Sequence, residues 1–230
     1  GHFKKTARAY KDFPALWGYD IFNETMFRSY DEYTMDEFRI WLKKKYGTID
    51  QLNRVWERTY SDFSQIDHEI WKWMSIMPDA DFALFRNASI GIFIKRWRSA
   101  IREIDQTHTI IADNIHSTVS PQCAYTRPQD DFDLKNCVDE IGMSFYPKQN
   151  DGTMENALRF EVFDGFYAAS RREGFYISEM QTHIQALYNP KTCVRPYELK
   201  RWCLEAYSSG IKGLIYCCLL YTSDAADDLL

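Results

Sequence analysis

The sequence predicts an α/β fold in which parallel strands alternate with helices, as in part of an eight-stranded (β/α)8 TIM barrel. Short apolar runs that end in polar residues alternate along the chain with longer segments of helical spacing. Four polar residues at the ends of successive runs are 32, 33 and 37 positions apart, so each step has the length of one strand and one helix. These four residues are Asn114, Tyr146, Glu179 and Tyr216.

Length, composition and charge fit one globular unit. The chain has 230 residues, of which 45% are hydrophobic and 27% charged. The net charge is −5, and acidic and basic residues are interspersed, so no basic surface for nucleic acid or an anionic membrane is expected. No apolar run approaches the roughly 20 residues of a membrane span. We therefore expect neither a nucleic-acid nor a membrane partner.

The six cysteines are scattered without the paired spacing of metal ligands. Free thiols in a reducing compartment are a better interpretation than disulfides, which favours a cytoplasmic location. Phosphate-binding loops and zinc-protease helices are also absent from the sequence. We therefore expect no metal and no cofactor. The cysteines are Cys123, Cys137, Cys193, Cys203, Cys217 and Cys218.

The first strand is expected at residues 13–24, after the tail of a helix at residues 1–12. This run is rich in aromatic and branched residues and ends abruptly in Asn23 and Glu24. A buried strand has this pattern when it delivers a carboxylate to the rim of a barrel.

Two helix starts follow the first strand. Thr34 and Glu37 have the spacing of a capping box, and Gly47 is expected to end the helix that they begin. Thr48 and Gln51 form a second capping box, which predicts a further short helix.

A long helix is expected at residues 79–105. Residues 60–78, before it, have no clean period, and we expect them to pass over the mouth of the barrel. The buried stripe of the long helix is predicted to consist of Phe82, Phe85, Ile92, Phe93, Ala100, Ile101 and Ile104.

The rest of the chain alternates regularly between strands and helices, which gives five strands in total. A closed barrel needs eight strands and typically about 250 residues, so three units are expected to be missing. The remaining elements are strands at 108–117, 138–148, 174–181 and 210–217, and helices at 153–173 and 196–210.

Two of the predicted strands each end in a glutamate, Glu24 and Glu179. The carboxyl ends of parallel strands meet at one rim of a barrel, so the two carboxylates are expected close together. Glycoside hydrolysis needs such a pair, and retaining enzymes place the two groups about 5–5.5 Å apart.

The longer motifs resemble family 42 β-galactosidases. The string FRIWLKKKYGTIDQLNRVWERTYSDFSQI, residues 38–66, closely resembles the segment that follows the acid/base glutamate in that family. Residues 127–133 and 141–148 resemble the same family or a near relative. The resemblance extends from residue 1 to about 217, and it implies a clan A barrel of which strands four to eight are present.

Residues 1–217 would then be part of a catalytic barrel. Residues 218–230 resemble translated sequencing-adapter read-through instead, so we expect a non-native tail there; a genuine disordered tail is the alternative. Many family members carry a zinc-binding cysteine cluster after the acid/base, but residues 25–36 contain no cysteine, so no zinc is expected.

The resemblance implies a retaining hydrolase of terminal β-galactosides, and its parent enzyme would be a homo-oligomer. The fragment itself is expected to be inactive. Another clan A activity, such as a β-glucosidase, β-mannosidase or arabinosidase, stays open. A non-catalytic carbohydrate-binding barrel is a further alternative, although the presence of both glutamates argues against it.

The resemblance also assigns roles to the strand ends. Glu24 would be the general acid/base and Glu179 the nucleophile, and the alternative for each is a salt-bridged glutamate at a strand end. Asn23 would donate to the 2-hydroxyl of the sugar, although asparagine is also common in turns.

Four further residues are candidates for the pocket. Tyr146 would donate a hydrogen bond to the nucleophile, unless it is a core tyrosine. Asn114 and His116 end the fifth barrel strand and could line the sugar pocket, and Gln181 follows the nucleophile and could form its rim.

Overall fold

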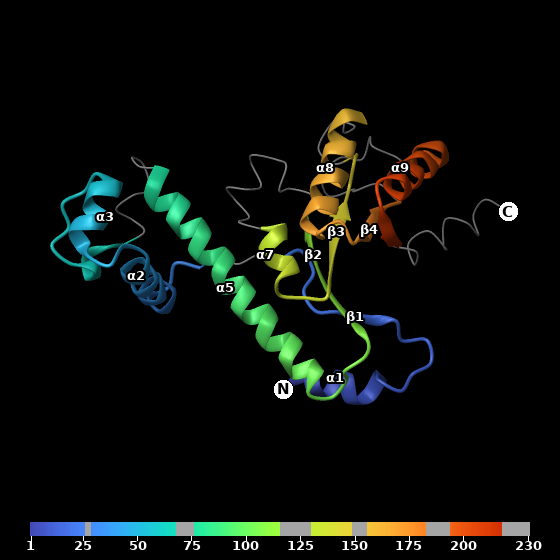
Figure 1. Ribbon diagram of the computed structural model, residues 1–230, viewed down its shortest axis with the longest axis horizontal. Helices are drawn as coiled ribbons and strands as arrows, with labels where there is room; N and C mark the ends of the chain where they lie inside the picture. The colour runs from blue at the N-terminus through green and yellow to red at the C-terminus, as the bar shows by residue number, and fades with distance from the viewer. Residues whose placement is uncertain (26–28, 68–75, 116–129, 149–155, 183–193, 218–230) are drawn as a thin grey trace.

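The computed structural model describes residues 1–25, 29–67, 76–115, 130–148, 156–182 and 194–217. Its centre is a sheet of five strands in the order β1-β2-β3-β4-β5, and every neighbouring pair is parallel (Figure 1). Because strand order equals chain order, each connection leads to the adjacent strand, as in a TIM barrel, and the predicted fold class is confirmed. The strands are β1 (Gly18–Asp20), β2 (Thr109–Ile115), β3 (Glu140–Phe145), β4 (Phe175–Gln181) and β5 (Ile211–Cys217).

Helices cover one face of this sheet. The main core lies between the strands and the inner sides of α8, α9 and the second half of α5. The helices are α1 (His2–Tyr10), α2 (Glu32–Tyr46), α3 (Ile49–Trp56), α5 (Ile76–Arg102), α7 (Asp131–Lys135), α8 (Asn156–Ala169) and α9 (Pro196–Ser208), with a short 3-10 helix η1 (Phe63–Gln65).

Strand β3 shows how the two faces of the sheet differ. Ile141, Met143 and Phe145 are fully buried against the helices. The ring centroid of Phe145 lies 4.8 Å from that of Phe163 in α8. Between them, Gly142 lies on the opposite face, where a Cβ atom would come within 3.0 Å of the Ser178 hydroxyl. The strands therefore pack closely on the inner face of the curled sheet, which is also the face that carries polar groups.

The first strand is shorter than the sequence predicted. Residues 13–17 form turns, in which the N–H of Phe13 donates to Tyr10 at 2.8 Å, and the Phe13 side chain is 59% exposed. Pro14 has no N–H with which to continue a ladder, so the run cannot pair along its whole length. Beyond β1, pairing with β2 continues through Ile21, whose N–H donates to Ile111 at 2.9 Å.

One of the two predicted helix starts is correct and the other is wrong. Thr48 caps α3 by accepting the N–H of Gln51 at 3.2 Å, as expected. Helix α2 begins earlier than predicted because Asp31 accepts the N–H of Thr34 at 2.8 Å and so takes the capping position. Gly47 ends α2 with a φ of 75°, as its position in the sequence predicted.

Helix α5 joins two separate cores, and its predicted buried stripe is only partly correct. Phe82, Phe85 and Ile101 are buried as expected, but Ile92 and Phe93 are 67% and 45% exposed. The buried positions between them are Ile90 and Ile94, because the helix passes there from one set of packing partners to the other. No helix in the described ranges is long and apolar enough to cross a membrane.

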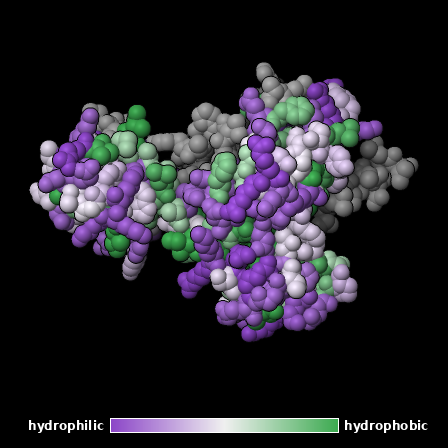
Figure 2. Space-filling model, viewed as in Figure 1, coloured by the Kyte–Doolittle hydropathy of each residue, from purple (hydrophilic) through white to green (hydrophobic). Residues whose placement is uncertain are grey.

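The second core is a helical cluster formed by α2, α3, η1 and the first half of α5. It lies at the left of Figure 1, away from the sheet, and forms the left-hand lobe in Figure 2. Its centre is Phe38, Leu42, Leu52 and Trp56, all almost fully buried. Ile66 is buried in the same cluster. The described part of the segment expected over the barrel mouth, residues 60–67, thus packs against this cluster; residues 68–75 lie outside the described ranges.

Candidate active site

The carboxyl ends of the strands bring Glu179 and Tyr146 into contact. The Tyr146 hydroxyl, just after β3, donates to Oε2 of Glu179 in β4 at 2.6 Å, so the expected hydrogen bond is present. Burial, the neighbouring Cys217 thiol and the charge of Glu179 all raise the pKa of Tyr146 far above its ordinary value. The phenol therefore stays protonated and acts as a donor to the carboxylate.

An irregularity in the β3–β4 pairing sets the direction of Glu179. Met143 pairs with Ile177, but the next residue of β3, Ser144, pairs with Glu179, so Ser178 is an extra residue in β4. Such a bulge changes which face of the sheet the following side chain occupies. It lets Glu179 share the inner face with Tyr146.

Asn23 connects the end of the first strand to the same carboxylate. In the orientation that directs its amide nitrogen at the acceptors, Nδ2 donates to Oε1 of Glu179 at 2.8 Å and to Oδ2 of Asp113 at 3.2 Å. The opposite orientation would place an amide oxygen against two carboxyl groups, and the hydrogen-bond network therefore assigns the amide. Asn23 is also exposed, so a ligand at this rim can reach it.

Glu24 follows Asn23 directly and has an unusual backbone. Its φ is 48°, in the left-handed region that non-glycine residues rarely adopt and that costs on the order of 1–3 kcal/mol. The next residue, Thr25, returns to the sheet, where its N–H donates to the carbonyl of Asp113 at 3.1 Å. Glu24 is half-buried and lies one residue from a direct contact with Glu179.

Asn114 lies behind this rim and connects three elements. Its Oδ1 accepts the hydroxyl of Thr25, and its Nδ2 donates to Oδ1 of Asp131 in α7 at 2.5 Å. Asn114 is fully buried. These contacts anchor the turn that contains Glu24, and a contact between Asn114 and sugar stays a prediction. His116 lies outside the described residues.

Gln181 fixes the ends of β3 and β4 to each other. Its Oε1 accepts the N–H of Lys148 at 2.9 Å, and its Nε2 donates to the carbonyl of the same residue at 3.3 Å. Gln181 is fully buried, so it supports the rim from behind. These two hydrogen bonds hold Tyr146, two residues before Lys148, beside Glu179.

Sequence reasoning missed two further acids, Asp20 and Asp113. Asp113 is fully buried, and burial followed by the charges of Asp20 and Glu179 raises its pKa to about 8. Asp20 is exposed as a residue, but burial of its carboxyl group, with a further contribution from the charge of Glu179, raises its pKa above the ordinary value. Both lie within apolar runs of the sequence, where an aspartate is itself a signal because a buried carboxyl group needs partners.

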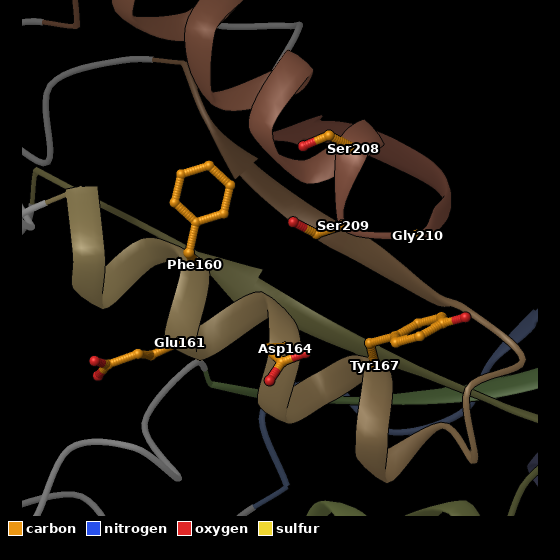
Figure 3. A pocket seen from close by; sticks show the side chains of 7 residues that line it. All are labelled: Phe160, Glu161, Asp164, Tyr167, Ser208, Ser209 and Gly210. Carbon is orange, nitrogen blue, oxygen red and sulfur yellow. The ribbon is translucent and has the colours of Figure 1, made fainter.

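A pocket lies away from this rim, between α8 and the turn that leads from α9 into β5 (Figure 3). It adjoins the beginning of β5, whereas active sites of TIM barrels lie at the carboxyl ends of the strands. The hydroxyls of Ser208 and Ser209 both donate to the carbonyl of Glu205, so the helix already uses them. The pocket is lined by Phe160, Glu161, Asp164, Tyr167, Ser208, Ser209 and Gly210.

Within the described ranges, no group of three or more His, Cys, Asp or Glu side chains has the arrangement of metal ligands. The chemistry available at the rim is that of carboxyl, amide and phenol groups.

One family of known proteins matches the chain along nearly its whole length. The family model for glycoside hydrolase family 42, described as beta-galactosidase, matches residues 2–227. The beta-galactosidase BgaP of Planococcus sp. (strain L4) is 25% identical over 231 residues, which cover 92% of this chain and 32% of that protein. The chain thus spans about a third of the length of the curated relatives with which it aligns along most of its length.

Solved structures share the fold. The beta-galactosidase of Bacillus circulans sp. alkalophilus superimposes with a TM-score of 0.80 at 19% identity, covering 94% of this chain and 32% of that one. The beta-galactosidase of the haloarchaeon Halorubrum lacusprofundi has a TM-score of 0.75 at 22% identity, covering 94% and 34%. The family match along nearly the whole sequence settles the classification: the chain belongs to glycoside hydrolase family 42, the beta-galactosidase family.

Proposed function

We propose that this chain carries the catalytic pair of a retaining β-galactosidase, with Glu24 as general acid/base and Glu179 as nucleophile. The observation that supports the proposal most strongly is the contact of Glu179 with both Tyr146 and Asn23. It brings the end of the first strand, where Glu24 lies, to the carboxylate of the fourth.

In the first step, a carboxylate oxygen of Glu179 attacks the anomeric carbon of the terminal galactoside. The bond from that carbon to the leaving oxygen breaks, and Glu24 gives its proton to this oxygen. Tyr146 keeps the attacking carboxylate ionised and oriented. When the sugar binds, the N–H of Asn23 that donates to Glu179 in the free site is shared with the 2-hydroxyl, and this hydrogen bond strengthens as positive charge develops on the sugar.

In the second step, Glu24, now a carboxylate, takes a proton from water. The water oxygen bonds to the anomeric carbon, and the bond between that carbon and Glu179 breaks. Two inversions at one carbon give net retention. Both glutamates return to their starting protonation states, so the cycle needs no cofactor.

We further propose that hydrolysis needs a longer polypeptide than these 230 residues. The matched beta-galactosidases are about three times as long, and the described residues form five strands, fewer than the eight that close a barrel. An open sheet leaves unpaired backbone groups at its edge strands, which favours association with other chains over a closed barrel. The tail at residues 218–230 stays a proposed non-native segment.

A panel of nitrophenyl glycosides tests the proposed activity. The chain is compared with a version completed by the preceding barrel strands of its own gene, on β-galactoside, β-glucoside, β-mannoside and α-arabinoside. The completed enzyme should hydrolyse the β-galactoside fastest, and the 230-residue chain should be inactive. The matched control is the completed enzyme with Glu24→Gln and Glu179→Gln together. Preference for another glycoside, or activity that survives in the control, would contradict the proposal.

A further inference from the structure

Asp113 is a buried acid with too few donors for its charge. The Ser144 hydroxyl donates to Oδ2 at 3.2 Å, and Asn23 donates to the same oxygen. The other oxygen, Oδ1, receives no hydrogen bond from any described residue, although Asp113 is fully buried. A buried carboxylate oxygen without a donor is costly, and binding a proton is one way to remove the cost.

Asp105, in the same protein, is a buried carboxylate with hydrogen-bond donors to both of its oxygens. Oδ2 accepts the Tyr19 hydroxyl at 2.8 Å, and Oδ1 accepts the N–H groups of Thr107 and His108 at 3.0 and 3.1 Å. Although burial opposes ionisation of Asp105, these bonds lower its pKa below the ordinary value. Asp105 and Asp113 are both buried and differ in their donors.

The neighbours of Asp113 add negative charge and no positive charge. Asp20 faces it from β1, Glu179 from β4 and the Ser144 hydroxyl from β3, and the Ser178 hydroxyl also lies close. No ion pair joins Asp20 or Asp113 to a cation among the residues that the structure describes. The two carboxyl groups are close enough that a proton held by one can be donated to the other, which favours the charged form of Asp20 and the protonated form of Asp113.

We propose that Asp20 and Asp113 share one proton and form a positioning pair, which keeps the amide nitrogen of Asn23 turned toward Glu179. The inference deepens the proposed function and rests on it for the role of Glu179. The proton lies on Asp113 and is donated to Asp20, so that Oδ2 of Asp113 stays an acceptor for Asn23.

The shared proton has two consequences. It holds the charge of the three acids Asp20, Asp113 and Glu179 at two negative charges instead of three. It also leaves an acceptor on each side of the Asn23 amide, at Oε1 of Glu179 and Oδ2 of Asp113. Loss of the proton leaves a charged Asp113, which holds the Asn23 amide more strongly and draws it away from Glu179 and the sugar, and so slows the reaction at alkaline pH.

Carboxyl NMR on the 230-residue chain tests the shared proton without any need for activity. With 13C-labelled aspartate, the Asp113 carboxyl should titrate several pH units above the ordinary value of about 3.9. In Asp20→Asn its midpoint should fall, because a negative neighbour has gone. Asp105 is the internal control and should titrate below the ordinary value. An Asp113 carboxyl that titrates near 4, or is unchanged by Asp20→Asn, would overturn the pair.

The pH profile of the completed enzyme tests the positioning role. Asp113→Asn imitates the protonated acid, so the alkaline limb of its kcat/KM profile should move to higher pH. Asp113→Leu removes the acceptor for Asn23 and should lower kcat at least tenfold with little change in KM. An unchanged alkaline limb in Asp113→Asn would refute the role. A completed enzyme without activity would count against the proposed function alone, since the NMR result stands separately.

Discussion

Glu179 is the residue at which most of the site's contacts meet. It accepts hydrogen bonds from the phenol of Tyr146, which follows the neighbouring strand β3, and from the amide of Asn23, which follows β1. Hydrogen bonds to a charged group contribute about 1.5–3 kcal/mol each. Because these donors come from different strands, the curl of the sheet determines the geometry of the nucleophile.

Replacement of Tyr146 by phenylalanine isolates one of these bonds. With the 2.6 Å contact removed, we expect kcat/KM of the completed enzyme to fall about 10- to 100-fold, which corresponds to about 1.5–3 kcal/mol. The measurement is steady-state hydrolysis of nitrophenyl β-galactoside. Tyr216→Phe is the matched control, because its hydroxyl lies 3.8 Å from the Cys203 sulfur, on the helix side of the sheet. Equal losses in both variants would show that the phenol has no special role at Tyr146.

At the residue scale, the polar residues at which apolar runs stop were predictable, and the acids within those runs were not. Glu24, Glu179 and Tyr146 stand out in the sequence because apolar runs stop at them. Asp20 and Asp113 lie within apolar runs, before the residues at which those runs stop, and their meeting depends on the register between β1 and β2. That register is set by pairing across the sheet, which a single sequence does not contain.

At the scale of elements, the helical cluster is an insertion between β1 and β2 with its own core. Asp81 in α5 joins its helices, because its Oδ2 accepts the Tyr46 hydroxyl at 2.6 Å and the Trp56 indole N–H at 2.9 Å. Lys45 forms an ion pair with the same carboxylate. Polar bonds of this kind fix how α2, α3 and α5 pack, in addition to the apolar contacts.

Truncation of Phe38 tests whether the core of the helical cluster contributes to the stability of the protein. Its ring is fully buried, and the ring centroid lies 5.0 Å from that of Phe82 and 5.3 Å from that of Phe85. Phe38→Ala should lower the free energy of unfolding by about 3–5 kcal/mol in chemical denaturation followed by tryptophan fluorescence. Tyr33→Ala, at a side chain that is 85% exposed, should change it by less than about 0.5 kcal/mol. Similar stabilities for the two variants would contradict the described core.

Local signals predicted some element boundaries and tertiary contacts decided others. Thr48 and Gly47 act through atoms three or four residues away, so the sequence shows them directly. The buried face of α5 depends on two different sets of neighbours, and one helical period could not describe both. Ile92 and Phe93 were therefore assigned to the wrong face.

At the scale of the whole molecule, the regular spacing of strand and helix units was enough to predict the parallel sheet. Each unit is recognised from the local spacing of its apolar residues. A helix between two strands returns the chain to the same end of the sheet, so the strands pair in parallel. The family resemblance came from the strings around residues 38–66, and the match over residues 2–227 confirms it. The irregular β3–β4 pairing that aims Glu179 could not be read from the chain, because a bulge exists only relative to a partner strand.

Rescue by azide in the completed enzyme tests the central claim most directly, that Glu24 and Glu179 are a retaining pair at one rim. The anomer of the galactosyl azide formed from an activated galactoside is read by NMR. Glu179→Ala should give the α-azide, because azide enters the space left by the nucleophile. Glu24→Ala should give the β-azide, because azide then attacks the glycosyl-enzyme from the opposite face. The same anomer from both variants, or no rescue in either, would contradict the assignment.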